Sequence, residues 1–160
     1  MSDTQWLSSM FLSSLNADDF LKILYAMMLE KSVIFVSDNL PLLSSAVLGM
    51  QCFLLPFKWN YVQIAILPKS LIEMVEAPMP FLVGLLKTHL QFVQHSLSPY
   101  TDDCTEKLIV YLNDKKKEVV VDTSCIKLPI PNFKKDKIPL IEKLILPFSV
   151  LNCSQSSYIV

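Results

Sequence analysis

The pattern of apolar and polar positions over residues 17–36 predicts a helix followed by a buried strand. Between residues 17 and 30, apolar side chains recur at every third or fourth position, which is typical of a helix with one face on a core. Asn16 precedes this helix as a plausible N-cap, and Asp18 and Asp19 suit the positive end of its dipole. The run at 33–36 is short, apolar and rich in β-branched residues, as in strands covered on both faces.

A second helix and a second strand follow directly. Residues 42–55 are apolar nearly all round and lie between Pro41 and Pro56, so they predict a buried helix. Residues 61–67 predict a second buried strand, which Pro68 ends. Strand, helix and strand with short links form a βαβ unit, which implies a parallel strand pair and a right-handed crossover.

Shorter elements are predicted beyond this unit. Short helices are expected at 69–76 and 85–95, and residues 81–86 fit either a strand or a helix. Two apolar runs around a polar connection, at 108–112 and 118–122, predict a β-hairpin.

Together these elements predict an α/β fold: a central sheet that contains the βαβ unit, helices on both faces, a β-hairpin and a C-terminal helix. The C-terminal helix is expected over about residues 138–146, because Pro139 suits the first turn of a helix. The predicted organisation is one main unit, 17–148, with a helical segment before it, 1–16, and a loose tail after it, 149–160.

Composition narrows the class of protein. The chain has 160 residues, 52% of them hydrophobic and 18% charged, which allows one well-buried domain and excludes a disordered chain. There are 14 lysines, 15 acids and no arginine, so the net charge of −1 provides no basic excess for binding nucleic acid. The two glycines, Gly49 and Gly84, cannot form a P-loop or a GxGxxG turn.

The mean hydropathy of +0.42 raises the question of a membrane-spanning helix. Within the charge-free stretch from 39 to 57, Pro41 and Pro56 limit a helix to about 14 residues, or about 21 Å, whereas a hydrocarbon core is about 30 Å thick. We therefore expect a helix buried on both sides or left bare by a missing neighbour. The three lysines at 115–117 allow at most a peripheral membrane contact.

The sequence contains no recognisable catalytic or metal-binding motif. His89 and His95 are not aligned on one helix face, and no acid is spaced to complete a metal site with either. No serine lies in a GxSxG elbow. The four cysteines, at 52, 104, 125 and 153, are widely spaced, and with no signal peptide before them they are expected to be reduced, buried thiols of a cytoplasmic protein. We expect no catalytic residue, no metal and no cofactor.

Residues 29–85 resemble the central module of DENN domains. Five short motifs of that family occur here in the family's order: LEKSVIFVS at 29–37, LLSS at 42–45, PFKW at 56–59, IAILP at 64–68 and APMPFLVG at 77–84. Looser similarity continues to about residue 148. The resemblance implies a three-layer DENN fold for residues 17–148 and partners in a longin-like module upstream and a helical DENN module downstream.

The resemblance also implies guanine-nucleotide exchange on a Rab-family small GTPase, in the cytoplasm or peripheral at vesicle or organelle membranes. Exchange requires no acid–base pair, since the factor only has to bind the nucleotide-free GTPase more tightly than the loaded one. Similarly folded GTPase-activating subunits use an arginine finger, which a chain without arginine cannot supply, so exchange is favoured over activation of hydrolysis. The alternative is a DENN-type scaffold subunit that binds partners without exchange activity.

Candidate GTPase-binding residues follow from where loops leave an open α/β sheet. Side chains beyond the carboxyl ends of the strands are the first choice, and large rings or apolar tips in other loops are the second. The candidates are Asp38, Asn39, Lys58, Trp59, Asn60, Lys69, Met79 and Pro80. For Trp59, a packed core position is at least as good an interpretation as a contact role.

Overall fold

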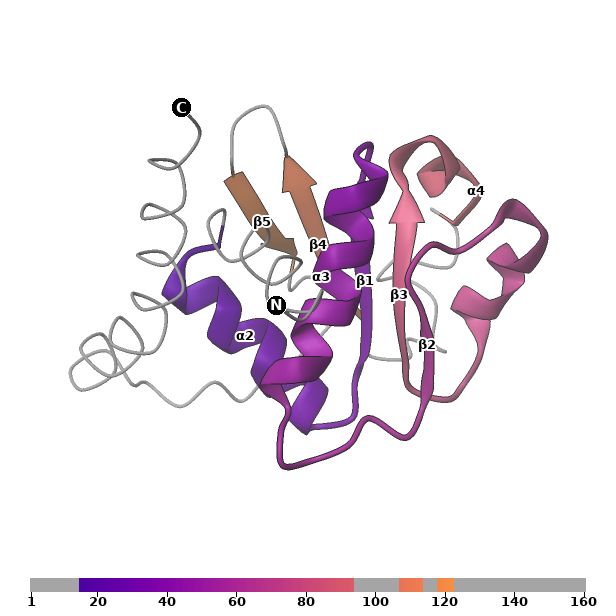
Figure 1. Cartoon of the computed structure of the whole chain (residues 1–160). Coiled ribbons are helices and arrows are strands. Elements are labelled where there is room, and N and C mark those ends of the chain that lie inside the picture. The colour runs from indigo at the N-terminus through magenta and orange to yellow at the C-terminus, as the bar shows by residue number, and fades with distance from the viewer. Residues whose placement is uncertain (1–14, 94–106, 114–117, 123–160) are drawn as a thin grey trace, which may run out of the picture.

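The computed structural model describes residues 15–93, 107–113 and 118–122. Its elements in chain order are α2 Ala17–Met28, β1 Ser32–Ser37, α3 Leu40–Phe53, β2 Val62–Ile64, the 3-10 segment η1 Lys69–Glu76, β3 Phe81–Leu86, the 3-10 turn η2 Lys87–His89, α4 Leu90–Val93, β4 Lys107–Asn113 and β5 Glu118–Asp122. Figure 1 shows the helices packed around one sheet. Residues 1–14 of the predicted helical segment 1–16, the predicted C-terminal helix at 138–146 and the tail at 149–160 lie outside the described residues.

The five strands form one sheet in the order β2-β3-β1-β4-β5. β1 lies at its centre and pairs in parallel with β3 on one side and with β4 on the other. β5 pairs antiparallel with β4, which confirms the predicted hairpin. Residues 81–86, which fitted either a strand or a helix in the sequence, form the strand β3 beside β1.

The predicted βαβ unit is present, but its two strands are not neighbours. β1, α3 and β2 follow one another as expected, yet β2 pairs with β3, and β3 occupies the place beside β1. The second strand is also shorter and less buried than predicted, because only Val62–Ile64 pair as a strand and all three are half-buried at the sheet edge. Beyond them, the Leu67 amide returns to the sheet and donates to the Gly84 carbonyl at 2.6 Å.

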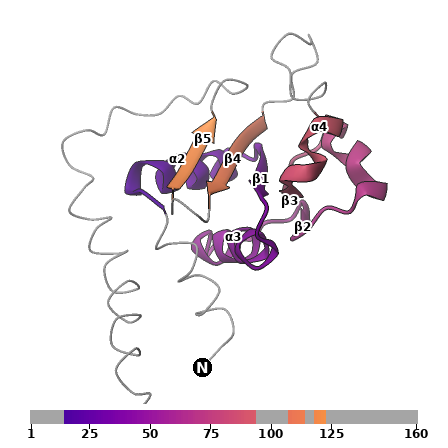
Figure 2. The same cartoon turned by 90° about the horizontal axis from the view of Figure 1, so that it is seen from above.

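Alternate side chains of the strands build two apolar layers. Val33 and Phe35 point to the face covered by α2 and α3, whereas Ile34 and Val36 point to the face covered by η1 and α4. Figure 2 shows α3 and α4 on opposite sides of the sheet. This period-two alternation, with both faces covered, explains the continuous apolar run of β1 and confirms the three-layer α/β fold.

Helix α2 ends where the backbone turns into the left-handed region at Glu30, with φ of 55°. The Glu30 amide donates to the Met27 carbonyl, and the Lys31 amide donates to the Ala26 carbonyl at 2.9 Å. This pair of bonds is a Schellman ending, which satisfies carbonyls that the helix itself leaves free. At the other end, Asn16 occupies the predicted N-cap position, but its side chain makes no capping hydrogen bond.

Two findings bear on membrane crossing and metal chemistry. Among the described helices, none combines the length and apolarity that a membrane span needs. Within the same residues, no three His, Cys, Asp or Glu side chains gather closely enough to hold a metal ion.

Of the four cysteines only Cys52 is described, and its thiol is free and exposed, so the prediction of a buried side chain is wrong at this position.

Candidate functional site

The strand order creates a crevice at the carboxyl ends of β1 and β3. These two parallel strands are neighbours, but the chain leaves β1 into α3 on one face and leaves β3 into η2 and α4 on the other (Figure 1). In an open α/β sheet, such a divergence of adjacent connections is the place where ligands and partners bind. We call the side chains there the carboxyl edge: Asp38, Asn39, Lys69, Lys87 and Phe92.

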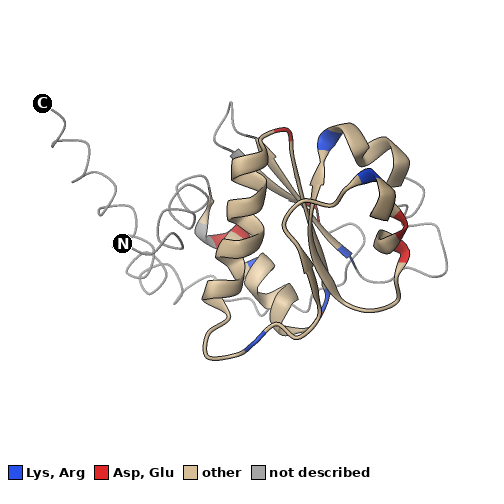
Figure 3. Cartoon of the chain, turned by 45° about the vertical axis from the view of Figure 1, so that its right-hand side comes forward, with Lys and Arg blue, Asp and Glu red and all other residues tan. Residues whose placement is uncertain are grey.

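Asp38 follows β1 and faces Lys87, which follows β3. The Asp38 carboxylate and the Lys87 ammonium lie 3.9 Å apart, and their side chains are 69% and 66% exposed. Such an exposed pair contributes little to stability, about 0–1 kcal/mol, so a partner can replace either ion at small cost. Figure 3 shows the two charge signs gathered at this edge, red in the turn before α3 and blue on the segments that follow β2 and β3.

Asn39 caps helix α3 at this edge. Its Oδ1 accepts a hydrogen bond from the Leu42 amide at 3.2 Å, and its own amide donates to the Ser37 hydroxyl at 3.1 Å. These bonds cap α3 and fix the turn after β1. Asn39 therefore positions Asp38 at the crevice, while its side-chain oxygen is engaged within the chain.

Lys69 and Phe92 form the other part of the carboxyl edge. The Lys69 ammonium lies 4.6 Å from the centre of the Phe92 ring, a cation–π contact, and about half of the Phe92 surface is exposed. Lys87 and Phe92 were not among the residues expected from the sequence, because residues 81–86 fitted either a strand or a helix. With β3 ending at Leu86, Lys87 is the first residue after the carboxyl end of this strand.

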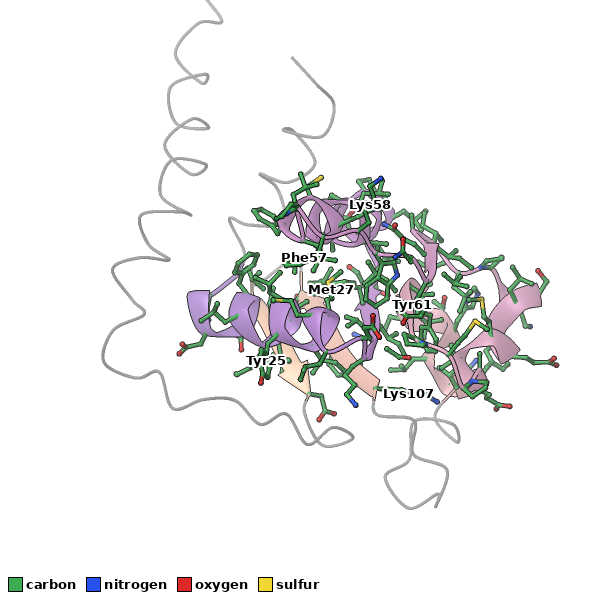
Figure 4. All side chains as sticks on the ribbon, turned by 90° about the horizontal axis from the view of Figure 1, so that it is seen from below. Tyr25, Met27, Phe57, Lys58, Tyr61 and Lys107 are labelled. Atoms are coloured by element: carbon green, nitrogen blue, oxygen red, sulfur yellow. The ribbon has the colours of Figure 1, made fainter. Side chains whose placement is uncertain are left out.

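The remaining predicted residues lie at the opposite, amino-terminal edge of the sheet. Lys58, Trp59 and Asn60 precede β2, and Met79 and Pro80 precede β3. Figure 4 views this edge and shows Lys58 beside Phe57 near the end of α3. The structure therefore divides the candidates into two groups at opposite ends of parallel strands.

Trp59 is a packed side chain with little surface. It is 9% exposed, its indole N–H donates to the Val62 carbonyl at 3.3 Å, and its ring meets Tyr61 edge-to-face at 5.4 Å. The side chain of Trp59 is therefore packed within the protein, as the core interpretation expected. Lys58 and Asn60 on either side of it are exposed.

At the amino-terminal edge, the Tyr61 side chain contacts the Glu30 side chain. A hydrogen bond to the Glu30 carboxylate, with smaller contributions from burial and from the negative charge of Glu30, raises the pKa of the Tyr61 phenol above its ordinary value of 10.0. The carboxylate accepts the phenolic proton and repels a phenolate. This contact joins the end of α2 to the start of β2.

Because of the Tyr61 contact, we expect the free energy of unfolding to fall at alkaline pH. Because the folded-state pKa is raised, the contribution of Tyr61 is fully present below the unfolded-state pKa near 10.0 and is lost as the pH rises through the folded-state pKa. In urea unfolding between neutral pH and pH above 10, the wild type should lose more free energy of unfolding than Tyr61→Phe. Glu30→Gln should weaken this dependence, and equal curves for wild type and Tyr61→Phe would contradict the assignment.

A family model of the DENN (AEX-3) domain matches residues 3–106, which include the carboxyl-terminal ends of β1, β2 and β3 and the crevice beside β1 and β3. Three of the curated relatives illustrate a match over part of their length. Mouse DENN domain-containing protein 2B is 42% identical over 76 residues, which are 48% of this chain and 7% of the mouse protein. Mouse DENN domain-containing protein 2A is 35% identical over 82 residues, or 51% of this chain and 8% of that protein.

A third relative is also matched over only part of its length. Human DENN domain-containing protein 2D is 33% identical over 88 residues, which are 55% of this chain and 19% of the human protein. This chain thus spans less than a fifth of each of these relatives, and the similarity concerns one part of larger proteins.

Proposed function

The chain belongs to the DENN (AEX-3) domain family, and from that membership we propose that it is part of a guanine-nucleotide exchange factor for a Rab-family small GTPase. The observation that carries the proposal is the family match over residues 3–106, which contains every strand end that borders the crevice at β1 and β3. Further proposed partners are a longin-like module and a downstream DENN module, and the proposed place of action is the cytoplasm, peripheral to vesicle or organelle membranes.

We assign the carboxyl edge as the GTPase contact. Its groups suit a partner that carries both charge signs beside an apolar surface: an exposed carboxylate at Asp38, ammonium groups at Lys69 and Lys87, and an exposed ring at Phe92. Because Asp38 and Lys87 are only loosely paired, an acidic or basic group of the partner can take the place of either.

The physical task needs no covalent chemistry. A ligand shifts an equilibrium only by its differential affinity for two states, so an exchange factor must bind the nucleotide-free GTPase more tightly than the GDP-bound form. A mixed polar and apolar edge on rigid strand ends can hold loops of the GTPase in a form that no longer retains magnesium and phosphate. The Asn39 cap and the parallel ladder of β1 and β3 provide that rigidity.

The test is the release of fluorescent GDP from a panel of Rab GTPases and capture of their nucleotide-free forms by the full 160-residue chain. Acceleration or capture of at least one Rab is expected, and the chain joined to a longin-like module should act faster. Lys69→Glu with Lys87→Glu should weaken capture about tenfold, equivalent to about 1.4 kcal/mol.

The matched control reverses a lysine at the opposite edge. Lys58→Glu should leave capture within about twofold, because Lys58 lies before β2 rather than beyond a carboxyl strand end. Loss of capture in Lys58→Glu alone would move the contact to the amino-terminal edge, to Lys58, Asn60, Met79 and Pro80. No capture of any Rab by the chain or the joined chain would overturn the exchange proposal.

A scaffold subunit without exchange activity is the second candidate. It is favoured by the exposed apolar side chains on α3 and the loop after it, which suit binding of another protein surface. Capture of a Rab with an unchanged rate of GDP release would support the scaffold over the exchange factor.

A further inference from the structure

The outer face of α3 is apolar, and none of the described residues covers it. The helix contains no charged residue over Leu40–Phe53, and seven of its residues are buried on the sheet. On the side away from the sheet, Leu40 and Leu48 are 44% and 40% exposed, and Cys52 is exposed one turn after Leu48. A helix that is apolar all round is ordinarily covered on all sides, so this outer face lacks a neighbour in the described part of the chain.

The apolar surface continues past the end of α3. Leu55 and Phe57 are 72% and 65% exposed, the largest exposures among the large hydrophobic side chains of the described residues. With Cys52 and Lys58 they line an open pocket of about 360 Å³. A single surface thus runs along α3 and into the loop that follows it; we call it the α3 face.

We propose that the α3 face binds a second copy of this chain, with the two α3 helices packed antiparallel about a two-fold axis near Leu48. An isologous interface requires a surface that complements itself. Position 48 then meets its own copy, Ser44 meets Cys52 of the partner, and Leu40 lies against the Leu55 turn of the partner. The proposal does not depend on GTPase binding.

The side chains suit this arrangement. Ser44 and Cys52 are small and uncharged, so the two helices can approach closely where they face each other. Both already have partners within their own helix: the Ser44 hydroxyl donates to the Leu40 carbonyl at 3.0 Å, and the Cys52 thiol donates to the Leu48 carbonyl at 3.6 Å. Neither side chain therefore introduces an unsatisfied polar group into the contact.

The charges at the two ends of α3 are complementary in the same arrangement. Asp38 precedes α3 and Lys58 follows it, and antiparallel packing places Asp38 of one copy near Lys58 of the other at both ends. Lys58 forms no ion pair within the described residues. Figure 3 shows the uncharged helix with an acid at its upper end and a base in the loop below.

A second copy fits these observations better than a membrane surface does. Binding to anionic lipid gains about 1 kcal/mol for each basic residue, and Lys58 is the only base lining the pocket. The exposed side chains also follow the length of a helix, as helix packing needs. Since a contact through one 14-residue helix and its loop is smaller than the usual interface of about 800 Å² per partner, we expect a weak dimer with Kd of about 10–100 μM.

Sedimentation of the full chain over a hundredfold range of concentration around that Kd tests the proposal. The wild type should pass from monomer to dimer, and Leu48→Glu should raise Kd at least tenfold, because two carboxylates would meet at the axis. Leu71→Glu is the matched control: Leu71 is also half-exposed but belongs to η1 on the other face of the sheet, so the dimer should persist.

Disulfide cross-linking locates the contact independently of stability. In a chain with serine at positions 104, 125 and 153, Ser44→Cys with the native Cys52 should yield a covalent dimer when an oxidant is added at dimer-forming concentration. The two thiols cannot bridge within one chain, because eight residues of helix separate them by about 12 Å and a disulfide needs Cα atoms within about 7 Å. Ser70→Cys with Cys52 should not cross-link.

Charge exchange completes the test. Lys58→Glu should weaken the dimer, and adding Asp38→Lys should restore it, because the pair is re-formed with opposite signs. A chain that stays monomeric throughout the range, or a dimer unaffected by Leu48→Glu and not cross-linked through position 44, overturns the proposal. Binding to anionic vesicles by a monomer, lost in Leu48→Glu, would overturn it in favour of a membrane surface.

Discussion

Replacing Gly84 with alanine should lower the free energy of unfolding by about 3 kcal/mol, the upper part of the range for overpacked cores. A Cβ atom at this position would collide with the Ala65 carbonyl oxygen and lie 2.7 Å from the Leu43 Cγ. The Leu43 side chain can shift, but the Ala65 oxygen belongs to the backbone next to β2. The collision can therefore be relieved only by moving β2 away from β3, which breaks the hydrogen bond from the Leu67 amide to Gly84.

Chemical unfolding of the full chain measures this effect. In a double-mutant cycle with Leu43→Ala, which is itself destabilising because Leu43 is fully buried, Gly84→Ala should cost less than it does in the wild type, since the side-chain collision is removed and only the backbone one is left. Amide exchange should show that Leu67 becomes less protected while β1 is affected least. An unchanged unfolding midpoint in Gly84→Ala would contradict the close approach of β2 to β3.

The second large effect concerns the centre of the sheet. Phe35→Ala should cost about 3–5 kcal/mol, because it leaves a cavity at the middle of β1 that helices on a packed sheet cannot fill. Phe35 is fully buried, and its backbone pairs with Gly84 on one side and Val110 on the other. Since a domain of this size has a total stability of about 5–15 kcal/mol, the variant should be partly unfolded at 37 °C.

The control for Phe35 is an exposed apolar position. Leu71→Ala, on η1, should change the free energy of unfolding by no more than about 0.5 kcal/mol. Thermal unfolding followed by circular dichroism distinguishes the two variants. Equal transition temperatures for Phe35→Ala and Leu71→Ala would show that Phe35 is not at the core of the fold.

The two proposed surfaces of the molecule share one residue, Asp38, which belongs to the carboxyl edge and also lies at one end of the α3 contact. The carboxyl edge carries Lys69, Lys87 and Phe92 beyond the ends of β2 and β3, whereas the α3 face is an uncharged stripe with its charges only at the ends. A dimer through the α3 face leaves Lys69 and Phe92 outside the contact. Each proposal can therefore fail without the other, since Leu48→Glu leaves the carboxyl edge unchanged.

The helices and strands with strong local signals were predicted from the sequence, including α2, β1, α3 and the hairpin of β4 and β5. The extent of β2 and the pairing of β1 were predicted less well. A β-branched apolar run is present at 61–67, but the chain bends after Ile64, where the Ala65 carbonyl passes over Gly84. Such a bend depends on the neighbouring strand, which a local pattern does not contain.

The candidate functional residues also divide into those that a local pattern identifies and those whose grouping depends on strand order. Asp38 and Lys69 were found because each follows a predicted strand, and Lys87 was missed because the strand before it was ambiguous. Grouping of the candidates depends on which strand ends share an edge. For that reason Lys58, Met79 and Pro80 were combined with Asp38 in the sequence analysis, although they lie at the other end of the sheet.

The α/β class, the order of the main elements and the family resemblance could be read from the amino-acid pattern, because periodicity and short motifs are local properties of the chain. Three features came from the fold alone: β3 lies between β1 and β2, Asp38 meets Lys87, and no described residue covers the outer face of the charge-free helix α3. Strand order and exposure are set by contacts between segments distant in the sequence. Such contacts are chosen by the packing of the whole core.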